Sequence, residues 1–386
     1  MVTIKEIAKY CNVSIATVSN IINGKPNASK ETKERVLQAI EELNYTPNYI
    51  AKNLKTRRTR TIGVVVEDIT VFCAPEIIDG ITKCCEEKGY HILLTNLRLY
   101  KKFGDSYYDN EKFFQMVRRE AKELIAKQVD GIVYVTAHER TLKCLPENLT
   151  VPASMAYGYT KSENYPSVVV DDKKGAYEIV NYVISMGHKN IGVITGKERS
   201  IHTHDRLLGY QKALYDHSLF FNPDAIVEGG WTREGGYEAT DRLLEQKVTA
   251  IFCMNDIMAG GVYDRLEELG LVPGQDISVV GFDNRELSNY YKPPLTTTAL
   301  PLYEIGYTAC ANVIEEVESE SEESSKKNDV AEESSVARKT KEAEKNTSGK
   351  VVEIPKMCKL LIRQSVKDIR NEELPDSVKL LTKIQH

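Results

Sequence analysis

The stretch TIKEIAKYCNVSIATVSNIINGK, residues 3–25, decides how the chain begins to fold. Thr3 and Glu6 have the spacing of a capping box, in which two side chains satisfy free backbone groups at a helix start. Ser14 is a helix-capping residue type before a second helix, and the pair Asn23-Gly24 ends that helix. Two short helices joined by about three residues form a helix-turn-helix.

A third predicted helix begins after its cap, Ser29, and completes a small three-helix domain. The outward face of the second helix presents Ile15, Ala16 and Asn20, whose short side chains can approach base edges in a major groove. Asn20 can form two hydrogen bonds with adenine, and Ile15 or Ala16 can contact thymine methyl groups. The alternative interpretation of this surface is the solvated face of a structural bundle.

Residues 46–55, TPNYIAKNLK, form the next candidate helix. Thr46 suits the capping position and Pro47 the first helical position, but two turns are too few for a stable isolated helix in water. The segment is therefore either a plain linker or a hinge that becomes helical only on DNA. In the second interpretation Leu54 is an apolar wedge.

The distribution of charge separates this head from the rest of the chain. The 386 residues carry a formal net charge of -5, which on its own argues against a nucleic-acid partner. Residues 1–61, however, contain eleven Lys or Arg and five Asp or Glu, a balance of +6. A basic head on an acidic body is the asymmetry expected when one small domain meets a polyanion.

Composition narrows the class of protein further. Hydrophobic residues make up 41% of the chain, which excludes a wholly disordered chain and a small disulfide scaffold. The eight cysteines form no C-x-x-C pair, so we expect reduced thiols. The N-terminus has no apolar signal region and no apolar run approaches membrane-spanning length, so we expect a cytoplasmic protein.

Residues 318–350 form a charged segment of a different kind. They contain nine acidic and seven basic residues, many serines and no aromatic residue. Such a composition buries too little apolar surface to offset its ordering entropy, so we predict a disordered insert. The insert is either a tolerated surface loop or a charged arm that binds a partner.

From Thr61 onward, short apolar runs alternate with helical stretches, which predicts an α/β body of parallel sheets. More than 300 residues are too many for one such sheet, so we expect two lobes with a ligand between the carboxyl ends of their strands. The predicted strands are 62–66, 92–95, 131–135, 167–170, 191–194, 250–254 and 277–282.

Four residues of the body have side chains suited to a small polar ligand. The fork of Arg206 matches a hydroxyl pair or a carboxylate, and Trp231, the only tryptophan, can stack on a sugar ring. Asn255 and Asp283 follow predicted strands, at the sheet edge where α/β proteins bind ligands. Each has a structural alternative, since a loop tryptophan is often part of a core and Asp256, next to Asn255, can cap the following helix.

Residues 3–8, 13–19 and 43–48 together resemble the head of the lactose-repressor/galactose-repressor (LacI/GalR) family. The resemblance runs to about residue 317 and resumes at 356–365. It implies that Ile15, Ala16 and Asn20 read bases and that Leu54 enters the minor groove, where such wedges kink the duplex. The family's phosphate-contacting positions fall on Thr3, Ser14, Asn23, Ser29, Tyr45 and Asn48. Most members have Arg at the position of Asn20, so we expect adenine rather than guanine to be read there.

The resemblance also implies a periplasmic-binding-protein-like body that forms a homodimer and places two heads on a near-palindromic operator. The chain would cross between lobes three times, near Tyr157–Lys161, near Ser288–Tyr291, and just before or within the insert. The implied divisions are a helix-turn-helix head (1–45), a hinge helix and linker (46–61), an N-terminal lobe (62–160 and 293–317) and a C-terminal lobe (161–292 and 351–386).

Effector-contacting positions of the family fall on Arg206, Trp231, Asn255 and Asp283. Phe72 is a further candidate because it lies where many members have a Pro-Phe-Phe segment. Tyr157 replaces a polar sugar-contacting position, so this side of the implied pocket is more aromatic and less polar. Such a pocket favours a glycoside, oligosaccharide or nucleoside with an apolar face.

The sequence thus predicts a sequence-specific DNA-binding repressor controlled by a small, carbohydrate-like effector, with no catalytic residue, cofactor or metal. A corepressor or a protein effector is the alternative within this class, and a transport solute-binding protein is a more distant one. Residues 192–197, GVITGK, are one residue short of a phosphate loop. His202-x-His204-Asp205 has no third ligand cluster at standard metal-site spacing.

Overall fold

The computed structural model describes residues 2–22, 24–25, 28–45, 58–104, 110–142, 145–146, 149–331 and 352–370. The chain divides into two compact units, residues 1–59 and 60–386, and each is described by itself. Within the described residues, no helix combines the length and apolar character needed to cross a membrane.

The first unit is the predicted three-helix head, with α1 (Ile4–Tyr10), α2 (Ile15–Ile22) and α3 (Lys30–Glu42). The capping box forms as predicted: the Thr3 backbone N–H donates to Glu6 Oε2 at 2.7 Å, and the Glu6 N–H donates to Thr3 Oγ1 at 3.4 Å. Ile7, Val18 and Val36, one from each helix, are fully buried. The expectation of three short, capped helices around one small core is confirmed.

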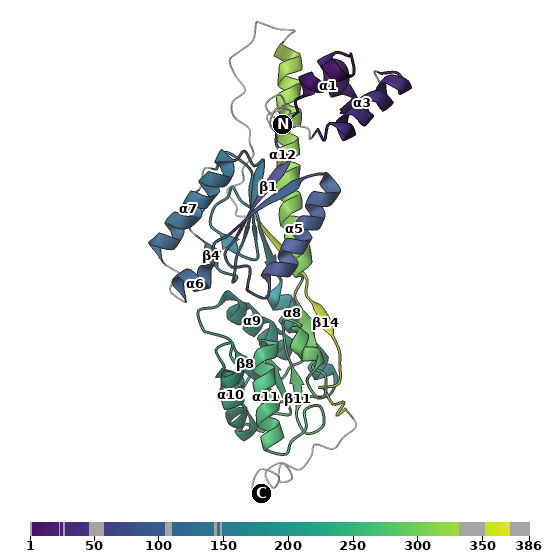
Figure 1. Ribbon diagram of the computed structural model, residues 1–386. Coiled ribbons are helices and arrows are strands. Elements are labelled where there is room, and N and C mark those ends of the chain that lie inside the picture. Colours follow the sequence, from purple (N-terminus) through teal and green to yellow (C-terminus); the bar gives the residue numbers. More distant parts are fainter. Residues whose placement is uncertain are drawn as a thin grey trace. The chain divides into compact units, whose positions relative to one another are not determined.

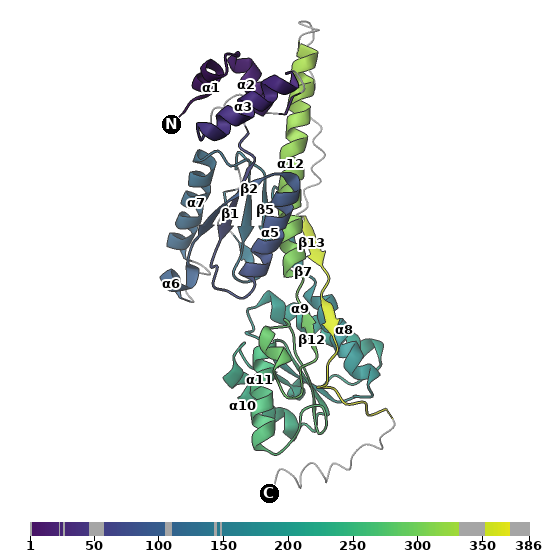
Figure 2. The same cartoon turned by 45° about the vertical axis from the view of Figure 1, so that its right-hand side comes forward.

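The N-terminal lobe is built on a six-stranded parallel sheet with the order β13-β7-β5-β3-β1-β2. Helices α6 and α7 cover one face, and α5 and α12 cover the other (Figures 1 and 2). Its strands are β1 (Thr61–Val66), β2 (His91–Asn96), β3 (Gly131–Val135), β5 (Ala153–Ala156), β7 (Ser167–Val170) and β13 (Glu353–Lys356). Its helices are α5 (Ala74–Lys88), α6 (Leu99–Phe103), α7 (Glu111–Ala126) and α12 (Leu302–Ala331), and a small parallel pair joins β4 (Thr141–Leu142) to β6 (Tyr159–Thr160).

The C-terminal lobe has a four-stranded parallel sheet with the order β11-β10-β8-β9. Its strands are β8 (Ile191–Thr195), β9 (Ile226–Glu228), β10 (Ala250–Cys253) and β11 (Ser278–Val280). Its α-helices are α8 (Asp172–Ser185), α9 (Ile201–Asp216), α10 (Arg233–Glu245) and α11 (Asp256–Glu268), with 3-10 turns at Pro223–Ala225 and Glu286–Asn289. An antiparallel pair, β12 (Thr297–Ala299) and β14 (Lys359–Leu361), completes it.

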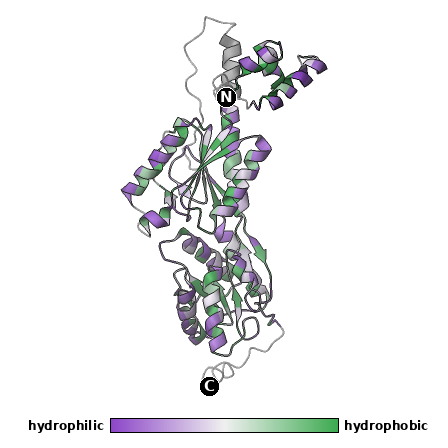
Figure 3. Ribbon diagram, in the orientation of Figure 1, coloured by the Kyte–Doolittle hydropathy of each residue, from purple (hydrophilic) through white to green (hydrophobic). Residues whose placement is uncertain are grey.

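Hydropathy follows this layering. The strands of both sheets are mostly hydrophobic, whereas the covering helices mix hydrophobic and hydrophilic residues (Figure 3). Strands covered by helices on both faces lose contact with water on both sides, so they read as continuous apolar runs. For this reason the apolar runs 62–66 and 131–135 predict strands correctly. The shorter strands β5 and β9 were not predicted from the sequence.

The chain crosses between the lobes three times, as expected, but at other residues. It crosses between β7 and α8, between β12 and α12, and between β13 and β14. The predicted crossings near Tyr157–Lys161, near Ser288–Tyr291 and at the insert are therefore corrected. The physical reason is strand pairing: β7 and β13 hydrogen-bond in the first sheet, which moves 161–170 and 353–356 into the N-terminal lobe.

The predicted disorder of residues 318–350 is also corrected in part, because α12 continues to Ala331. The first turns of α12 pack on α5, and this packing stabilises the first helical turn, whose formation is the unfavourable step. Later residues then extend the existing helix without a second nucleation. The following Glu and Lys residues are good helix formers. Residues 332–350 lie outside the described residues, as do residues 46–57 of the predicted hinge and linker (46–61).

Candidate functional site

The predicted base-reading residues lie together on α2. The side chain of Ile15 is 45% exposed, Ala16 is exposed, and Asn20 is half-buried. Val18 and Ile21, on the opposite face of α2, pack in the core of the head. This division between a buried apolar face and a face of short side chains is the arrangement that a recognition helix needs.

Three predicted phosphate-contacting residues cap helices. Besides Thr3, the Ser14 hydroxyl accepts the Thr17 N–H at 3.0 Å, and the Ser29 hydroxyl accepts the Thr32 N–H at 3.3 Å. Helix starts favour phosphate because their free N–H groups point outward. Tyr45 packs partly against the core of the head. The other residues predicted to contact DNA, Asn23, Asn48 and Leu54, lie outside the described residues.

In the body, Arg206 is the centre of the predicted effector site. Its side chain is 2% exposed, and its Nε donates to Asp172 Oδ1 at 2.6 Å. Its Nη1 lies 3.3 Å from Asp283 Oδ1 and also donates to the Met254 carbonyl. The guanidinium carbon lies 3.9 Å from the ring centre of Phe282. The two predicted residues Arg206 and Asp283 are thus in direct contact.

The pKa values of these groups follow from burial and charge. Burial disfavours the charged form of Asp172, but the charges of Arg206 and His202 outweigh it and lower the pKa of Asp172 to about 2. At Asp283 burial prevails over the nearby Arg206 and raises the pKa of the carboxyl. The buried guanidinium therefore pairs with one firmly ionised carboxylate and one that is protonated more readily.

Trp231 and Asn255 lie beside this ion pair. The Trp231 ring packs on Gly196, so closely that a Cβ there would lie 1.9 Å from a ring atom, and its centre is 5.7 Å from the Arg206 guanidinium carbon. Asn255 caps α11 by accepting the Met258 N–H at 2.8 Å, and its amide donates to the Trp231 carbonyl at 3.3 Å. The cap of α11 is therefore Asn255 and not Asp256, the residue for which the sequence suggested this role.

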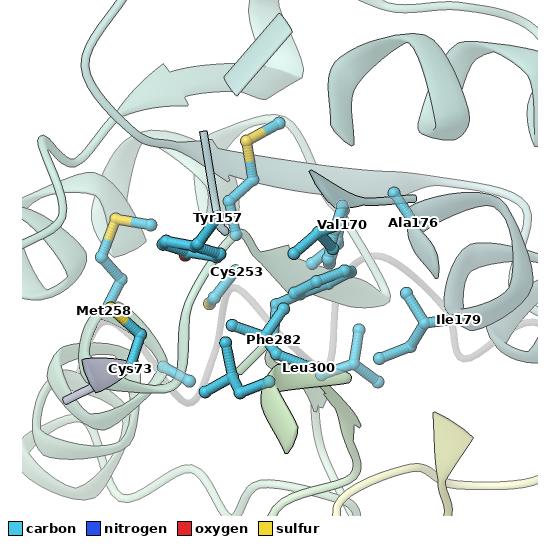
Figure 4. Packing of buried hydrophobic residues seen from close by; sticks show 14 of the residues in the cluster. Cys73, Tyr157, Val170, Ala176, Ile179, Cys253, Met258, Phe282 and Leu300 are labelled. Carbon is cyan, nitrogen blue, oxygen red and sulfur yellow. The ribbon is translucent and has the colours of Figure 1, made fainter. Parts of the chain in front are cut away.

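Tyr157 and Phe72 bring the N-terminal lobe into contact with this region. Tyr157 is buried, and its hydroxyl lies 3.2 Å from His202 Nε2. Tyr157 and Phe282 belong to the same buried cluster (Figure 4). Phe72 is half-buried, and the guanidinium carbon of Arg285 lies 4.2 Å from its ring centre.

Three of the six predicted effector residues share an unusual backbone conformation. The φ angles of Tyr157, Trp231 and Asp283 are 63°, 73° and 99°. A side chain makes such a conformation cost roughly 1–3 kcal/mol, and residues of this kind cluster at ligand-binding sites.

The prediction missed two acidic residues at the centre of the cluster, Glu139 and Asp172, and dismissed His202. His202 Nδ1 lies 2.5 Å from Asp172 Oδ2 and 3.3 Å from Glu139 Oε2. Burial raises the pKa of Glu139 to about 8, while the two carboxylates raise that of His202 against the effect of burial. Asp172 lies two residues after β7, close to the position that selected Asp283, whereas Glu139 lies four residues after β3 and that rule would have missed it.

These three side chains are the group within the described residues that could hold a metal ion. One ligand atom from each, the Nδ1 of His202 and a carboxylate oxygen of Glu139 and of Asp172, lie within 4.8 Å of one another. An open cavity of about 430 Å³ lies nearby at the lobe junction. It is lined by Thr141, Tyr159, Thr160, Lys161, Ile201, Asp205 and Glu353, none of which is a predicted effector residue.

The head and the body match known families. Residues 3–48 match the model of bacterial regulatory proteins of the lacI family, and residues 180–340 match a periplasmic binding protein-like domain. Catabolite control protein A of Priestia megaterium is 35% identical over 316 residues, 80% of this chain and 90% of that protein. The HTH-type transcriptional repressor PurR of Vibrio campbellii is 32% identical over 327 residues, 84% of this chain and 94% of that protein.

Solved structures share the fold. The lac repressor dimer bound to operator and the anti-inducer ONPF has a TM-score of 0.69 at 24% identity, with 95% of this chain and 99% of that chain covered. The complex of the transcriptional regulator CelR with cellobiose has a TM-score of 0.54 at 22% identity, with 95% and 100% covered.

A helix-turn-helix head on a two-lobed, periplasmic-binding-protein-like body defines a ligand-responsive DNA-binding regulator. The chain belongs to the lacI family of bacterial regulatory proteins, and it is a transcriptional repressor with a ligand-binding domain. The expected α/β fold class and family are thereby confirmed.

Proposed function

We propose that this repressor binds a near-palindromic operator as a homodimer and that a small hydroxylated ligand between the lobes controls its affinity for DNA. The observation that carries the proposal is the buried Arg206, which lies between two carboxylates and beside the Trp231 ring. Planar guanidinium and carboxylate groups bind vicinal hydroxyls through paired hydrogen bonds, and an indole face covers the apolar side of a sugar ring.

The aromatic side of the region favours a glycoside, an oligosaccharide or a nucleoside over a small polar monosaccharide. Tyr157 and Phe72 supply the aromatic surface on the N-terminal lobe, and both lie near charged groups of the C-terminal lobe. A ligand that replaces these contacts between lobes changes the free energy of lobe closure. By linkage, a ligand that weakens operator binding is itself bound less tightly when DNA is present.

The test begins with operator selection by the purified full-length protein, followed by titration of a ligand panel against the selected operator. The panel contains monosaccharides, glycosides, disaccharides and nucleosides, and thermal shift of the same protein reports binding directly. We expect a glycoside, disaccharide or nucleoside to raise the melting temperature and to change operator affinity. Stabilisation by monosaccharides alone would contradict the proposed ligand class.

A matched pair of variants tests the site. Asp283→Asn removes the carboxylate charge beside Arg206, whereas Asp264→Asn removes an exposed carboxylate that pairs with Arg233 on the surface. We expect only Asp283→Asn to abolish the ligand response. A repressor that binds its operator but responds to none of the small molecules would favour the alternative of a corepressor outside the panel or a protein effector.

A further inference from the structure

We propose that Glu139, Asp172 and His202 form a binding site for a divalent transition-metal ion at the junction of the two lobes. Glu139 follows β3 in the N-terminal lobe, Asp172 is the first residue of α8, and His202 lies on α9 of the C-terminal lobe. All three are buried, with exposed fractions of 3%, 1% and 8%. One nitrogen and two oxygens from three elements therefore converge on a single point.

One of these atoms has no partner of its own. Glu139 Oε2 is buried and accepts no hydrogen bond from any described residue. It lies 3.3 Å from His202 Nδ1, but that nitrogen is engaged with Asp172 Oδ2 at 2.5 Å. A buried carboxylate oxygen without a partner costs free energy, and a metal ion between the three groups would remove that cost.

The atoms on the far side of each ligand are already held. The Val170 N–H donates to Glu139 Oε1 at 2.9 Å, and Arg206 Nε donates to Asp172 Oδ1 at 2.6 Å. The Tyr157 hydroxyl lies 3.2 Å from His202 Nε2. Metal sites typically orient their ligands through such outer contacts, which leave the inner atoms free to face the ion.

The ligand set selects the class of ion. One imidazole and two carboxylates suit Mn²⁺, Fe²⁺, Co²⁺ or Zn²⁺, and three protein ligands leave open positions for water or for a ligand hydroxyl. On binding, Glu139 and His202 Nδ1 would release their protons to the solvent, and the two carboxylate charges would then balance a divalent ion, while Arg206 has a second carboxylate partner in Asp283. Ligand atoms about 2.1 Å from one ion lie roughly 3.0–3.4 Å apart, so binding requires Asp172 and His202 to separate slightly.

An ion held here would join the two lobes, because Glu139 and His202 belong to different lobes. It would stabilise the arrangement in which these residues meet. If operator binding depends on lobe closure, as in the proposed function, the ion would act as an effector or would complete the site for one. Binding of the ion itself requires neither operator nor organic ligand, so it is tested separately.

Mn²⁺ is the appropriate probe, since carboxylates bind it well whereas thiols prefer softer ions, and the chain contains eight cysteines. Electron paramagnetic resonance of the full-length protein titrated with Mn²⁺ counts bound ions through loss of the free-ion signal. We expect one ion per chain and a rise in melting temperature. His202→Asn and Glu139→Gln should each weaken binding at least about tenfold, and Tyr157→Phe by roughly 10–100-fold.

The controls are matched by residue type. His204 lies on α9, the helix of His202, but is exposed, and Glu198 is an exposed acidic residue just before α9. We expect His204→Asn and Glu198→Gln to bind Mn²⁺ like the wild type. Circular dichroism establishes that each variant is folded. If His202→Asn unfolds, Glu139→Gln still tests the site, because glutamine has the same shape as glutamate. Absence of a stoichiometric ion in the wild type, or equal binding by folded Glu139→Gln, would overturn the proposal.

Operator affinity with and without Mn²⁺ then tests the regulatory consequence. If Mn²⁺ changes the operator affinity of the wild type but not that of Glu139→Gln, the result supports a regulatory role for the ion. Stoichiometric Mn²⁺ binding without any change in operator affinity would refute the regulatory role while leaving the metal site in place. Loss of operator binding under all conditions would instead refute the proposed function.

Discussion

The buried Arg206 and Asp172 side chains are joined by a 2.6 Å contact between Nε and Oδ1. Asp172 begins α8, where the chain enters the C-terminal lobe, and Arg206 lies on α9, so the pair joins two neighbouring helices of that lobe. We expect Arg206→Met to destabilise the protein by about 3–5 kcal/mol, because it leaves a buried carboxylate without its partner.

Urea unfolding of the full-length protein measures this loss. The control is Arg118→Met, which removes an arginine of similar reach from an exposed pair with Glu111 at 3.0 Å. Exposed pairs of this kind contribute about 0–1 kcal/mol. Equal losses in the two variants would show that the buried pair does not stabilise the fold.

Gly196 leaves room for Trp231. A Cβ at residue 196 would lie 1.9 Å from the indole ring, so Gly196→Ala must displace the ring at a cost of about 1–3 kcal/mol. Trp231 is the only tryptophan, so its fluorescence reports the displacement directly. We expect a shifted emission maximum and a lower unfolding free energy. In a Trp231→Leu background, Gly196→Ala should lower the unfolding free energy by less. An equal loss in that background would show that displacement of the indole ring is not the cause.

We expect His188 to make the stability of the C-terminal lobe depend on pH. Its side chain is 1% exposed, with Nδ1 2.9 Å from Thr249 Oγ1 and Nε2 3.0 Å from Ser278 Oγ and 3.1 Å from the Lys367 carbonyl. Burial, with a contribution from the Lys367 charge, lowers the pKa of His188 below 6.5, although the Lys367 carbonyl and the Asp368 charge act in the opposite direction.

The unfolded chain therefore binds a proton at His188 at a higher pH than the folded chain does. Stability from this residue is complete above about pH 6.5 and falls as the pH falls through that value. Glu139 and His202, whose pKa values are raised, act in the opposite direction in both proteins, so the test is the difference in unfolding free energy between the wild type and His188→Gln. As the pH falls from 7.5 to 5, the wild type should lose stability relative to His188→Gln. Lys189→Gln, at the exposed neighbouring residue, should keep the wild-type slope. An unchanged slope in His188→Gln would assign the dependence to other groups.

Asn20 on α2 is proposed to read adenine through two hydrogen bonds. Asn20→Ala should weaken binding to the selected operator by about 1–3 kcal/mol and relax the base preference at one position of each half-site. Asn20→Arg should convert that preference to guanine. Gln38→Ala, at an exposed residue of α3, should alter neither. Binding selections with the purified variants report both quantities, and a guanine preference that requires Asn20 would refute the adenine assignment.

Much of this architecture could be predicted from local sequence. The Thr3–Glu6 capping box forms as its spacing requires, because the two residues are neighbours on the first helical turn. The apolar run at 62–66 becomes a central strand, because only a strand covered on both faces tolerates such a run. Asp283 was expected at a sheet edge because it follows a predicted strand, and the tertiary structure brings it to Arg206 on α9. Contact of these residues with an effector stays a prediction.

Other features could not be predicted, because they depend on pairing between distant segments. Residues 353–356 become an edge strand of the first sheet only because β7 offers them a parallel partner, and that pairing decides where the chain changes lobes. The helical continuation of residues 318–331 depends on the packing of the preceding turns of α12 against α5.

The sequence by itself determined the capped head, the alternation of strands and helices, and the residue types that we expect to face a ligand. These properties depend on neighbours in the chain, whose geometry the backbone dictates. Only the tertiary structure decided that Glu139 and His202, from different lobes, would meet Asp172 at one buried point. Burial there removes water from three ionisable groups, so their charges act on one another at short range, and no local pattern encodes that proximity.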